Sequence, residues 1–207
     1  MRDAPVLLFD LGGVLVQASG LPTLQKLLPR LERAEVVARW YASKAVGLFE
    51  RGSIGPEDFA QAFTAEWELE VSPAEFLAVF GSWVDGLYPG AAELLRSLRG
   101  RHTIACLSNT NATHWAKLAE VHELFDVCVP SHLIGCMKPD LAAYHHALQQ
   151  VGAPPRDVWF FDDHLPNVVA ARAVGMRSFH VQGLAATIAA LHEAGVQTSG
   201  YEHKGVA

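Results

Sequence analysis

Short apolar runs alternate with amphipathic segments along most of the 207-residue chain. The first run, 6–9, is apolar at every position and ends at Asp10 before two glycines, which is typical of a buried strand that leads into a tight turn. The same patterns predict further strands at 103–107, 125–129, 158–161 and 178–181, and helices at 91–99, 111–121, 139–151, 167–174 and 184–194. This alternation predicts an α/β fold, a doubly wound (Rossmann-like) parallel sheet with helices on both faces.

Residues 21–84 differ from the rest, because their apolar positions repeat at helical spacing throughout. Pro56 begins one predicted helix, and Ser72 with Glu75 forms the capping box of another. Polar linkers are predicted at 17–20 and 85–90. We therefore expect a core domain of residues 1–16 and 88–207, and an inserted, small α-helical cap domain of residues 17–87 over the carboxyl ends of the strands. Three of the five tryptophans lie in this cap, where we expect packing, with a place in a substrate pocket as the alternative.

Composition narrows the classes of partner. The net charge of −6 argues against a general nucleic-acid or anionic-membrane surface, but a local site can still bind a phosphorylated metabolite. The three cysteines lack metal-ligand spacing, so we expect free thiols and a cytoplasmic protein. No signal peptide or membrane span is predicted, and the polar tail 197–207 is expected to fray. The oligomeric state stays open.

Polar residues follow three of the predicted strands directly. Asp10, Ser108 and the pair Asp162–Asp163 stand at strand ends, and Lys138 precedes a helix that begins with proline. Because the carboxyl ends of parallel strands meet at one edge of the sheet, we expect all of these residues to converge. Taken singly, each has a plainer explanation: the aspartates and the serine could cap helices, and the lysine could be solvated.

Together these residues have the chemistry of a covalent phosphatase. Carboxylates gathered in one crevice need a cation, and hard oxygen ligands favour Mg²⁺. A carboxylate can also attack phosphorus and form an aspartyl-phosphate. Lys138 and the Ser108 hydroxyl would then bind the phosphoryl oxygens.

Four motifs carry a family resemblance. Phe-Asp-Leu-Gly-Gly-Val-Leu, Leu-Ser-Asn-Thr-Asn, Met-Lys-Pro-Asp and Phe-Phe-Asp-Asp-His-Leu-Pro-Asn resemble, in this order, the motifs of the haloacid dehalogenase superfamily. Within it, the chain is most similar to the α-D-glucose-1-phosphate phosphatase group, which shares Asp-Leu-Gly, Ser-Asn-Thr-Asn and the cap segment 49–54. The resemblance implies that Asp10 is the nucleophile, with Ser108 and Lys138 as catalytic residues that hold the phosphate. It also implies Mg²⁺ ligands, namely Asp10, the Gly12 carbonyl, Asp162 and Asp163.

Four further residues are candidates for substrate contact. Asn109 and Asn111 follow Ser108 in the second motif, and Glu50 and Arg51 lie in the cap. Asn111 could equally cap the helix that follows it, and Glu50 with Arg51 could be an exposed ion pair.

Residue 12 departs from the family pattern. Most phosphatases of the superfamily have an aspartate two residues after the nucleophile as general acid and base, and here that residue is Gly12. Its absence could cost about 10²–10⁴-fold in rate, least for good leaving groups, unless a water held by Asn111 or His164 replaces it. We expect a Mg²⁺-dependent phosphatase of small phosphorylated metabolites, with sugar phosphates favoured. The alternatives are a metal-independent 2-haloacid dehalogenase and a non-catalytic binding module that has lost its general acid.

Overall fold

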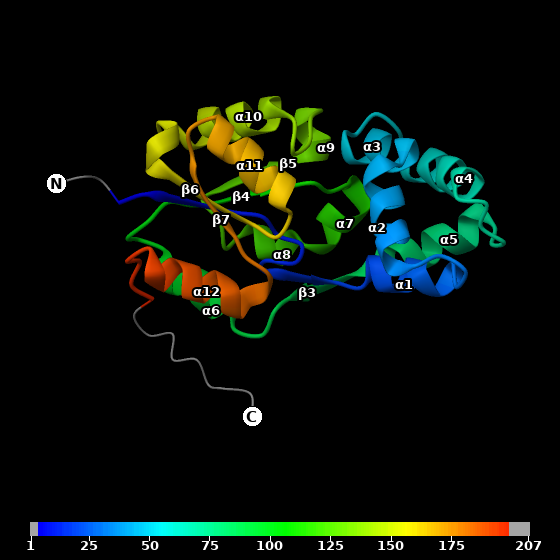
Figure 1. Ribbon diagram of the computed structural model, residues 1–207, viewed down its shortest axis with the longest axis horizontal. Coiled ribbons are helices and arrows are strands. Elements are labelled where there is room, and N and C mark those ends of the chain that lie inside the picture. The colour runs from blue at the N-terminus through cyan, green and yellow to red at the C-terminus, as the bar shows by residue number, and fades with distance from the viewer. Residues whose placement is uncertain (1–3, 199–207) are drawn as a thin grey trace.

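A five-stranded parallel sheet forms the centre of the computed structural model, which describes residues 4–198 (Figure 1). The strands lie in the order β5 (Val127–Pro130), β4 (Ile104–Ser108), β1 (Val6–Phe9), β6 (Val158–Asp162) and β7 (Arg177–His180). The first strand of the chain is therefore the central one, hydrogen-bonded to β4 on one side and β6 on the other. The predicted parallel sheet is confirmed.

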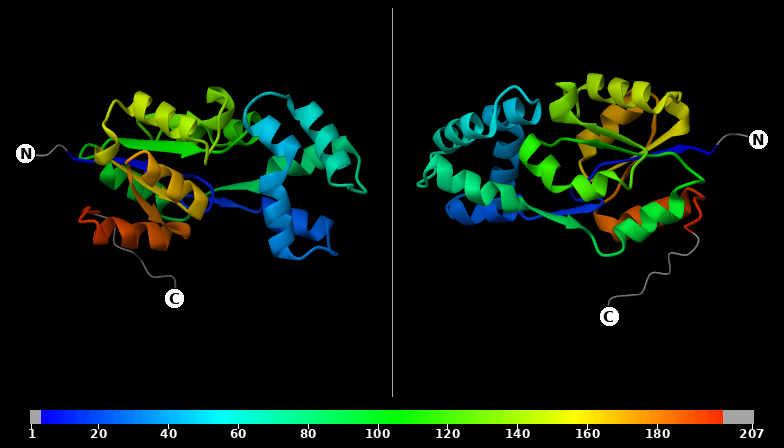
Figure 2. Two further views of the ribbon diagram at one scale, coloured as in Figure 1. Left: turned by 45° about the horizontal axis from the view of Figure 1, so that its top comes forward. Right: turned by 180° about the vertical axis from the view of Figure 1, so that it is seen from behind.

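Helices cover both faces of this sheet, as Figures 1 and 2 show. Side chains alternate along β1, so that Leu7 and Phe9 pack with α6 (Ala91–Leu98) and α12 (Gly183–Glu193). Leu8 points the other way, into the cluster formed by α10 (Leu141–Val151) and α11 (Leu165–Ala173). Both faces of β1 are buried, which explains why its sequence is continuously apolar. The doubly wound arrangement is confirmed.

One predicted helix is divided. The segment 111–121 forms α7 (Ala112–Lys117) and α8 (Ala119–His122), because Leu118 between them has a non-helical backbone. This break lets Leu118 and Val121 reach the core below β4. Two short elements were not predicted, namely α9 (Ser131–Ile134) and the 3-10 turn η2 (Pro155–Asp157).

The predicted linkers at 17–20 and 85–90 were also wrong in part. The first residues of both linkers lie in an antiparallel two-stranded ribbon of β2 (Val16–Ala18) and β3 (Val84–Leu87), with Val16 opposite Leu87. Each strand alone is too short to give a period-2 pattern, and the pairing joins residues about 70 positions apart in the sequence. The ribbon carries the chain out to the inserted helices and back.

The inserted segment forms a helical unit beyond the carboxyl ends of the strands (Figure 1). Its elements are α1 (Gly20–Leu27), α2 (Arg33–Ala42), α3 (Lys44–Glu50), α4 (Pro56–Glu66), α5 (Pro73–Phe80) and the 3-10 turn η1 (Gly81–Trp83). The unit has an aromatic core of its own, in which Phe63 stacks on Phe76 with ring centroids 4.8 Å apart. The predicted capping box of Ser72 and Glu75 is present. We propose on this basis that residues 17–87 are a separate cap domain.

The remaining expectations concern membranes and the tail. Among the described residues, no helix is long and apolar enough to cross a membrane. Residues 199–207 of the predicted frayed tail lie outside the described residues. Thr198, which precedes them, is buried and lies 2.6 Å from His192 through its hydroxyl.

Candidate active site

Asp10 and Asp162 lie side by side at the ends of neighbouring strands. The Asp10 backbone N–H donates a hydrogen bond of 2.8 Å to the Phe161 carbonyl, so β1 and β6 end at the same level. Both side chains are buried, with 9% and 0% of the residue exposed. Two carboxylates thus meet at the sheet edge, as the order of the strands predicts.

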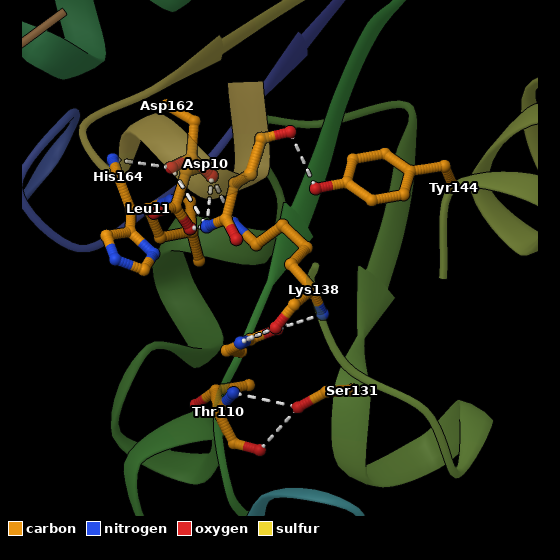
Figure 3. Close-up of polar contacts among 10 residues, drawn as sticks. Asp10, Leu11, Thr110, Ser131, Lys138, Tyr144, Asp162 and His164 are labelled. Atoms are coloured by element: carbon orange, nitrogen blue, oxygen red, sulfur yellow. Dashed lines mark hydrogen bonds and ion pairs between the residues drawn. The ribbon is translucent and has the colours of Figure 1, made fainter. Parts of the chain in front are cut away.

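Lys138 lies between these two carboxylates (Figure 3). Its Nζ is 2.8 Å from Asp10 Oδ1 and 2.6 Å from Asp162 Oδ2, and its side chain is 1% exposed. One ammonium group therefore binds both acids, which is far from the solvated lysine that is the common state of this residue type. Because a buried charge is costly unless it is paired, the three groups depend on one another.

A third carboxylate completes an acidic cluster. Asp10, Asp162 and Asp163 each offer one oxygen, and these oxygens lie within 4.8 Å of one another. Gly13 makes this approach possible, since its φ is +72° and any side chain there would overlap the Asp163 carboxylate. Three carboxylates and one ammonium leave an excess of negative charge, and their hard oxygen donors suit a divalent cation such as Mg²⁺.

The electrostatics of the cluster follow from burial. Burial raises the pKa of Asp10 to about 7, although Lys138 opposes the shift, and Asp162 and Asp163 add to it. The pKa of Asp163 is also raised, first by burial and then by Asp162. Burial alone would lower the pKa of Lys138, but the two adjacent carboxylates raise it above its usual value. Lys138 therefore stays charged and favours the ionised form of Asp10.

Asp162 is held in one orientation by its neighbours. The His164 backbone N–H donates to Oδ1 at 2.8 Å, and the Asn167 amide donates to both oxygens at 3.0 and 3.1 Å. Tyr144 in turn donates to the Asn167 carbonyl at 2.8 Å (Figure 3). Such a network fixes a carboxylate for a second task, because its lone pairs are oriented before any ligand binds.

Ser108, Asn109 and Asn111 of the second motif differ in their contacts. Ser108 ends β4 and is buried, and its hydroxyl makes no hydrogen bond with any residue between 4 and 198, although Ser108 is not among the residues that line the cavity. Asn109 lines the cavity but also makes two hydrogen bonds of 2.8 Å to the backbone of Lys138. Asn111 caps α7, accepting a hydrogen bond from the His114 N–H. Of the two explanations for Asn111, the structure shows the cap.

Asn109→Ala is expected to disturb Lys138 rather than the substrate directly. The amide satisfies both the N–H and the carbonyl of Lys138, so its loss should cost about 1–3 kcal/mol in the free energy of unfolding. A displaced Lys138 should also lower kcat. Urea unfolding and steady-state kinetics measure both effects. A variant of unchanged stability with only a raised KM would show that Asn109 acts by substrate contact alone.

A cavity of about 370 Å³ opens above the cluster. Asp10, Gly12, Lys138 and Asp163 form its floor. The facing wall comes from the ribbon and the cap, and its residues are Ala18, Leu21, Pro22, Arg33, Trp40, Tyr41, Glu50, Trp83 and Val84. Two of the cap tryptophans thus line the cavity, whereas Trp67 is buried within the cap core. Packing was the expected role of all three cap tryptophans, and it is the whole role of Trp67, whereas the other two also line the cavity.

Glu50 and Arg51 have different surroundings in the structure. Glu50 is the last residue of α3, is 9% exposed and lines the cavity. Arg51 is not among the lining residues and forms an ion pair of 2.9 Å with Asp140 of the core. The alternative of an exposed Glu–Arg pair therefore fails, since Arg51 has a different partner and Glu50 faces the interior.

Sequence reasoning missed one contact across the cavity mouth. The ring of Tyr41 in α2 stacks on the imidazole of His164, with centroids 4.3 Å apart and planes 3° from parallel. Tyr41 ends the apolar face that the sequence shows at 36, 37, 40 and 41, but nothing in that spacing indicates which residue of the core it meets.

Comparisons with known proteins agree with this geometry. Residues 5–175 match the family of haloacid dehalogenase-like hydrolases, and the chain belongs to that family. It is therefore a hydrolase, as the four motifs predict. The sesquiterpene phosphatase astK of Aspergillus oryzae is 34% identical over 192 residues, which cover 90% of this chain and 94% of that protein.

Solved structures share the fold at low identity. A haloacid dehalogenase family enzyme of Bacteroides thetaiotaomicron, crystallised with magnesium and inorganic phosphate, is 22% identical, with a TM-score of 0.70 over 86% of this chain and 94% of that one. A hydrolase of the same type from Porphyromonas gingivalis has a TM-score of 0.74 and 19% identity, over 94% and 98% of the two chains.

Proposed function

We propose that the protein is a Mg²⁺-dependent phosphatase of small phosphorylated metabolites that acts through an aspartyl-phosphate. The observation that carries this proposal is the convergence of Asp10, Lys138 and Asp163 on one cavity, with the buried Asp162 paired to Lys138 behind them. The phosphatase relative covers nearly the whole chain and supports the same reaction class.

In this proposal Asp10 is the nucleophile. Its carboxylate would attack phosphorus, and Lys138 and the free Ser108 hydroxyl would bind the phosphoryl oxygens. Lys138 already contacts Asp10, so the charge that binds the phosphate also keeps the nucleophile ionised. Asn109 acts here as a positioning residue for Lys138.

Asp10, Asp162, Asp163 and the Gly12 carbonyl would hold the Mg²⁺. The three carboxylate oxygens are close enough together for one ion, and their excess negative charge fits a divalent cation. When bound, Mg²⁺ supplies positive charge against the phosphoryl oxygens. The Bacteroides relative was crystallised with this ion and with phosphate.

Two substrate classes compete for the cavity. The resemblance to the α-D-glucose-1-phosphate phosphatase group favours a sugar phosphate. The wall of Leu21, Trp40 and Trp83 instead favours the phosphate of an apolar alcohol, and the Aspergillus relative is named for a sesquiterpene substrate. We propose a cytoplasmic location as well, and the three free cysteines support it.

The two other hypotheses make different demands on the same residues. A metal-independent 2-haloacid dehalogenase would leave Asp162 and Asp163 as extra charges beside the attacking carboxylate, with Lys138 alone to balance them. A non-catalytic binding module would not need a lysine that contacts two buried carboxylates at the cavity. Chloride release from a 2-haloacid in the presence of EDTA would support the first.

A phosphatase screen with and without Mg²⁺ tests the proposal. Sugar, prenyl, nucleotide and amino-acid monophosphates are offered to the purified protein, and phosphate release is measured. We expect turnover that EDTA abolishes and Mg²⁺ restores, since the acidic cluster needs a cation to approach a phosphate dianion. Turnover that is unchanged in EDTA contradicts the metal requirement, and no turnover on any ester contradicts the proposal.

A further inference from the structure

The position of the missing acid is open in the structure. Gly12 lies in the cavity floor two residues after Asp10, and a Cβ at Gly12 would meet no atom within 4 Å. Its φ is outside the left-handed region, so glycine is not required by the backbone. An acidic side chain at position 12 would therefore fit, and Gly12 leaves that space empty.

The two groups that sequence reasoning suggested as substitutes are engaged elsewhere. Asn111 caps α7 and contacts His114 at 3.2 Å through its amide. The His164 ring stacks on Tyr41, which leaves it at the cavity mouth. Each of these two side chains therefore already has a partner in the structure.

Glu50 enters the same cavity from the cap. It is nine-tenths buried, yet its carboxylate makes no hydrogen bond or ion pair with any other residue in the described range 4–198. An unpartnered carboxylate at such a depth is costly to a fold and is typical of a functional group.

The two residues after Glu50 fix its direction. Arg51 is bound to Asp140 of the core at 2.9 Å. Gly52 has a φ of +69° and lies so close to the His132 carbonyl that any side chain would overlap it. The end of α3 is thus docked on the core, and Glu50 lines the same cavity as Asp10 and Gly12.

We propose that Glu50 is the proton donor and acceptor of the reaction, in place of an acid at position 12. This inference rests on the proposed phosphatase function. In the first step an Asp10 oxygen bonds to phosphorus, the bond from phosphorus to the ester oxygen breaks, and the Glu50 proton moves to that oxygen to give the alcohol. In the second step water attacks the aspartyl-phosphate, its proton moves to Glu50, and the bond from phosphorus to Asp10 breaks to release phosphate.

The surroundings of Glu50 support this role. Burial raises the pKa of Glu50 to about 7, opposed by the positive charges of Lys138 and Arg51 and aided by Asp10. A carboxyl group with such a pKa gives and takes a proton near neutral pH.

Glu50→Gln tests the proposal through two substrates. With an alkyl phosphate, whose leaving oxygen needs a proton, kcat should fall by about 10²–10⁴-fold. With p-nitrophenyl phosphate the first step needs no donor, but the second still lacks its base. We therefore expect a burst of one nitrophenolate per enzyme molecule followed by slow turnover. The exposed Glu57→Gln in α4 is the matched control and should behave as wild type.

A double variant tests whether Glu50→Gln is slow because it lacks a proton donor. Adding Gly12→Asp to Glu50→Gln places an acid in the open space and should restore alkyl phosphate hydrolysis to within about tenfold of wild type. Stability is checked by urea unfolding at pH 8, where Glu50→Gln should be at least as stable as wild type, because an ionised Glu50 is buried without a partner.

Several results would overturn the inference. A raised KM with unchanged kcat and no burst would make Glu50 a substrate-binding residue, and a lower stability at pH 8 would make it a structural one. A double variant as slow as the single one would also refute it. If wild type is active and Glu50→Gln is equally active, only this inference fails, whereas an inactive wild type refutes the phosphatase function as well.

Discussion

Asp10→Asn should lower phosphatase turnover by roughly 10⁴–10⁶-fold, the range observed when a hydrolase loses its nucleophile or the partner of that nucleophile. The amide keeps the shape of the side chain but cannot attack phosphorus. Lys138 retains Asp162 as its partner at 2.6 Å, so the fold should survive. Turnover is measured with the best substrate of the screen, and circular dichroism confirms folding.

The same variant separates catalysis from mere binding. An acid-quenched reaction of the wild type should yield a phosphorylated peptide that contains Asp10, and Asp10→Asn should yield none. Mass spectrometry excludes deamidation back to aspartate. Turnover equal to wild type would mean that the activity comes from a contaminant or that Asp10 is not the nucleophile, and it would favour the binding-module hypothesis.

Lys138→Met should damage stability and activity together. It removes the only charge that contacts Asp10 and Asp162, within the part of the chain that the structure describes, and it does so at a fully buried site. Breaking a buried pair in this way costs about 3–5 kcal/mol in the free energy of unfolding. Phosphate binding loses the same charge, so turnover should fall by at least about 10³-fold.

The loss of stability in Lys138→Met should depend on pH. Asp10 has a pKa raised to about 7 by burial, and Lys138 lowers it, so the variant should raise it further. A carboxyl group whose pKa is raised by folding contributes stability below its unfolded pKa and loses it as the pH rises through the folded value. The variant should therefore be less destabilised at pH 5 than at pH 8.

Urea unfolding at both pH values, with and without Mg²⁺, measures this effect. Mg²⁺ should recover part of the stability at pH 8, because a cation at the acidic cluster offsets the lost ammonium. The exposed Lys117→Met is the control. Equal destabilisation at pH 5 and pH 8 would contradict the electrostatic account and point to lost packing of the lysine stem.

The sheet and the edge that carries the candidate site were predictable from sequence for a simple reason. Each strand is indicated by a local apolar run in the sequence. Because the strands are parallel, Asp10, Ser108 and Asp162 at their ends can be assigned to one edge without any knowledge of side-chain contacts. The same convergence predicted that Lys138 reaches this edge, but neither its burial nor its contact with both acids was predicted.

What the sequence missed depends on contacts between distant segments. The pairing of β2 with β3 joins short segments that have no pattern of their own. Trp67 and Trp83 both belong to the cap core, but only Trp83 also lines the cavity, and helical spacing does not distinguish the two. The burial of Glu50 depends on the docking of Arg51 and Gly52 on the core, which no helical periodicity encodes.

The ribbon of β2 and β3 bears on how such a chain can change its specificity. Because Val16 lies opposite Leu87, the insertion leaves and re-enters the core at a single point, and recombination could exchange it as one block. In this protein the exchanged cap would include Glu50, the proposed proton donor. A chimaera that receives a cap without a glutamate equivalent to Glu50 would gain a new pocket and lose its acid, unless Gly12 changed to aspartate at the same time.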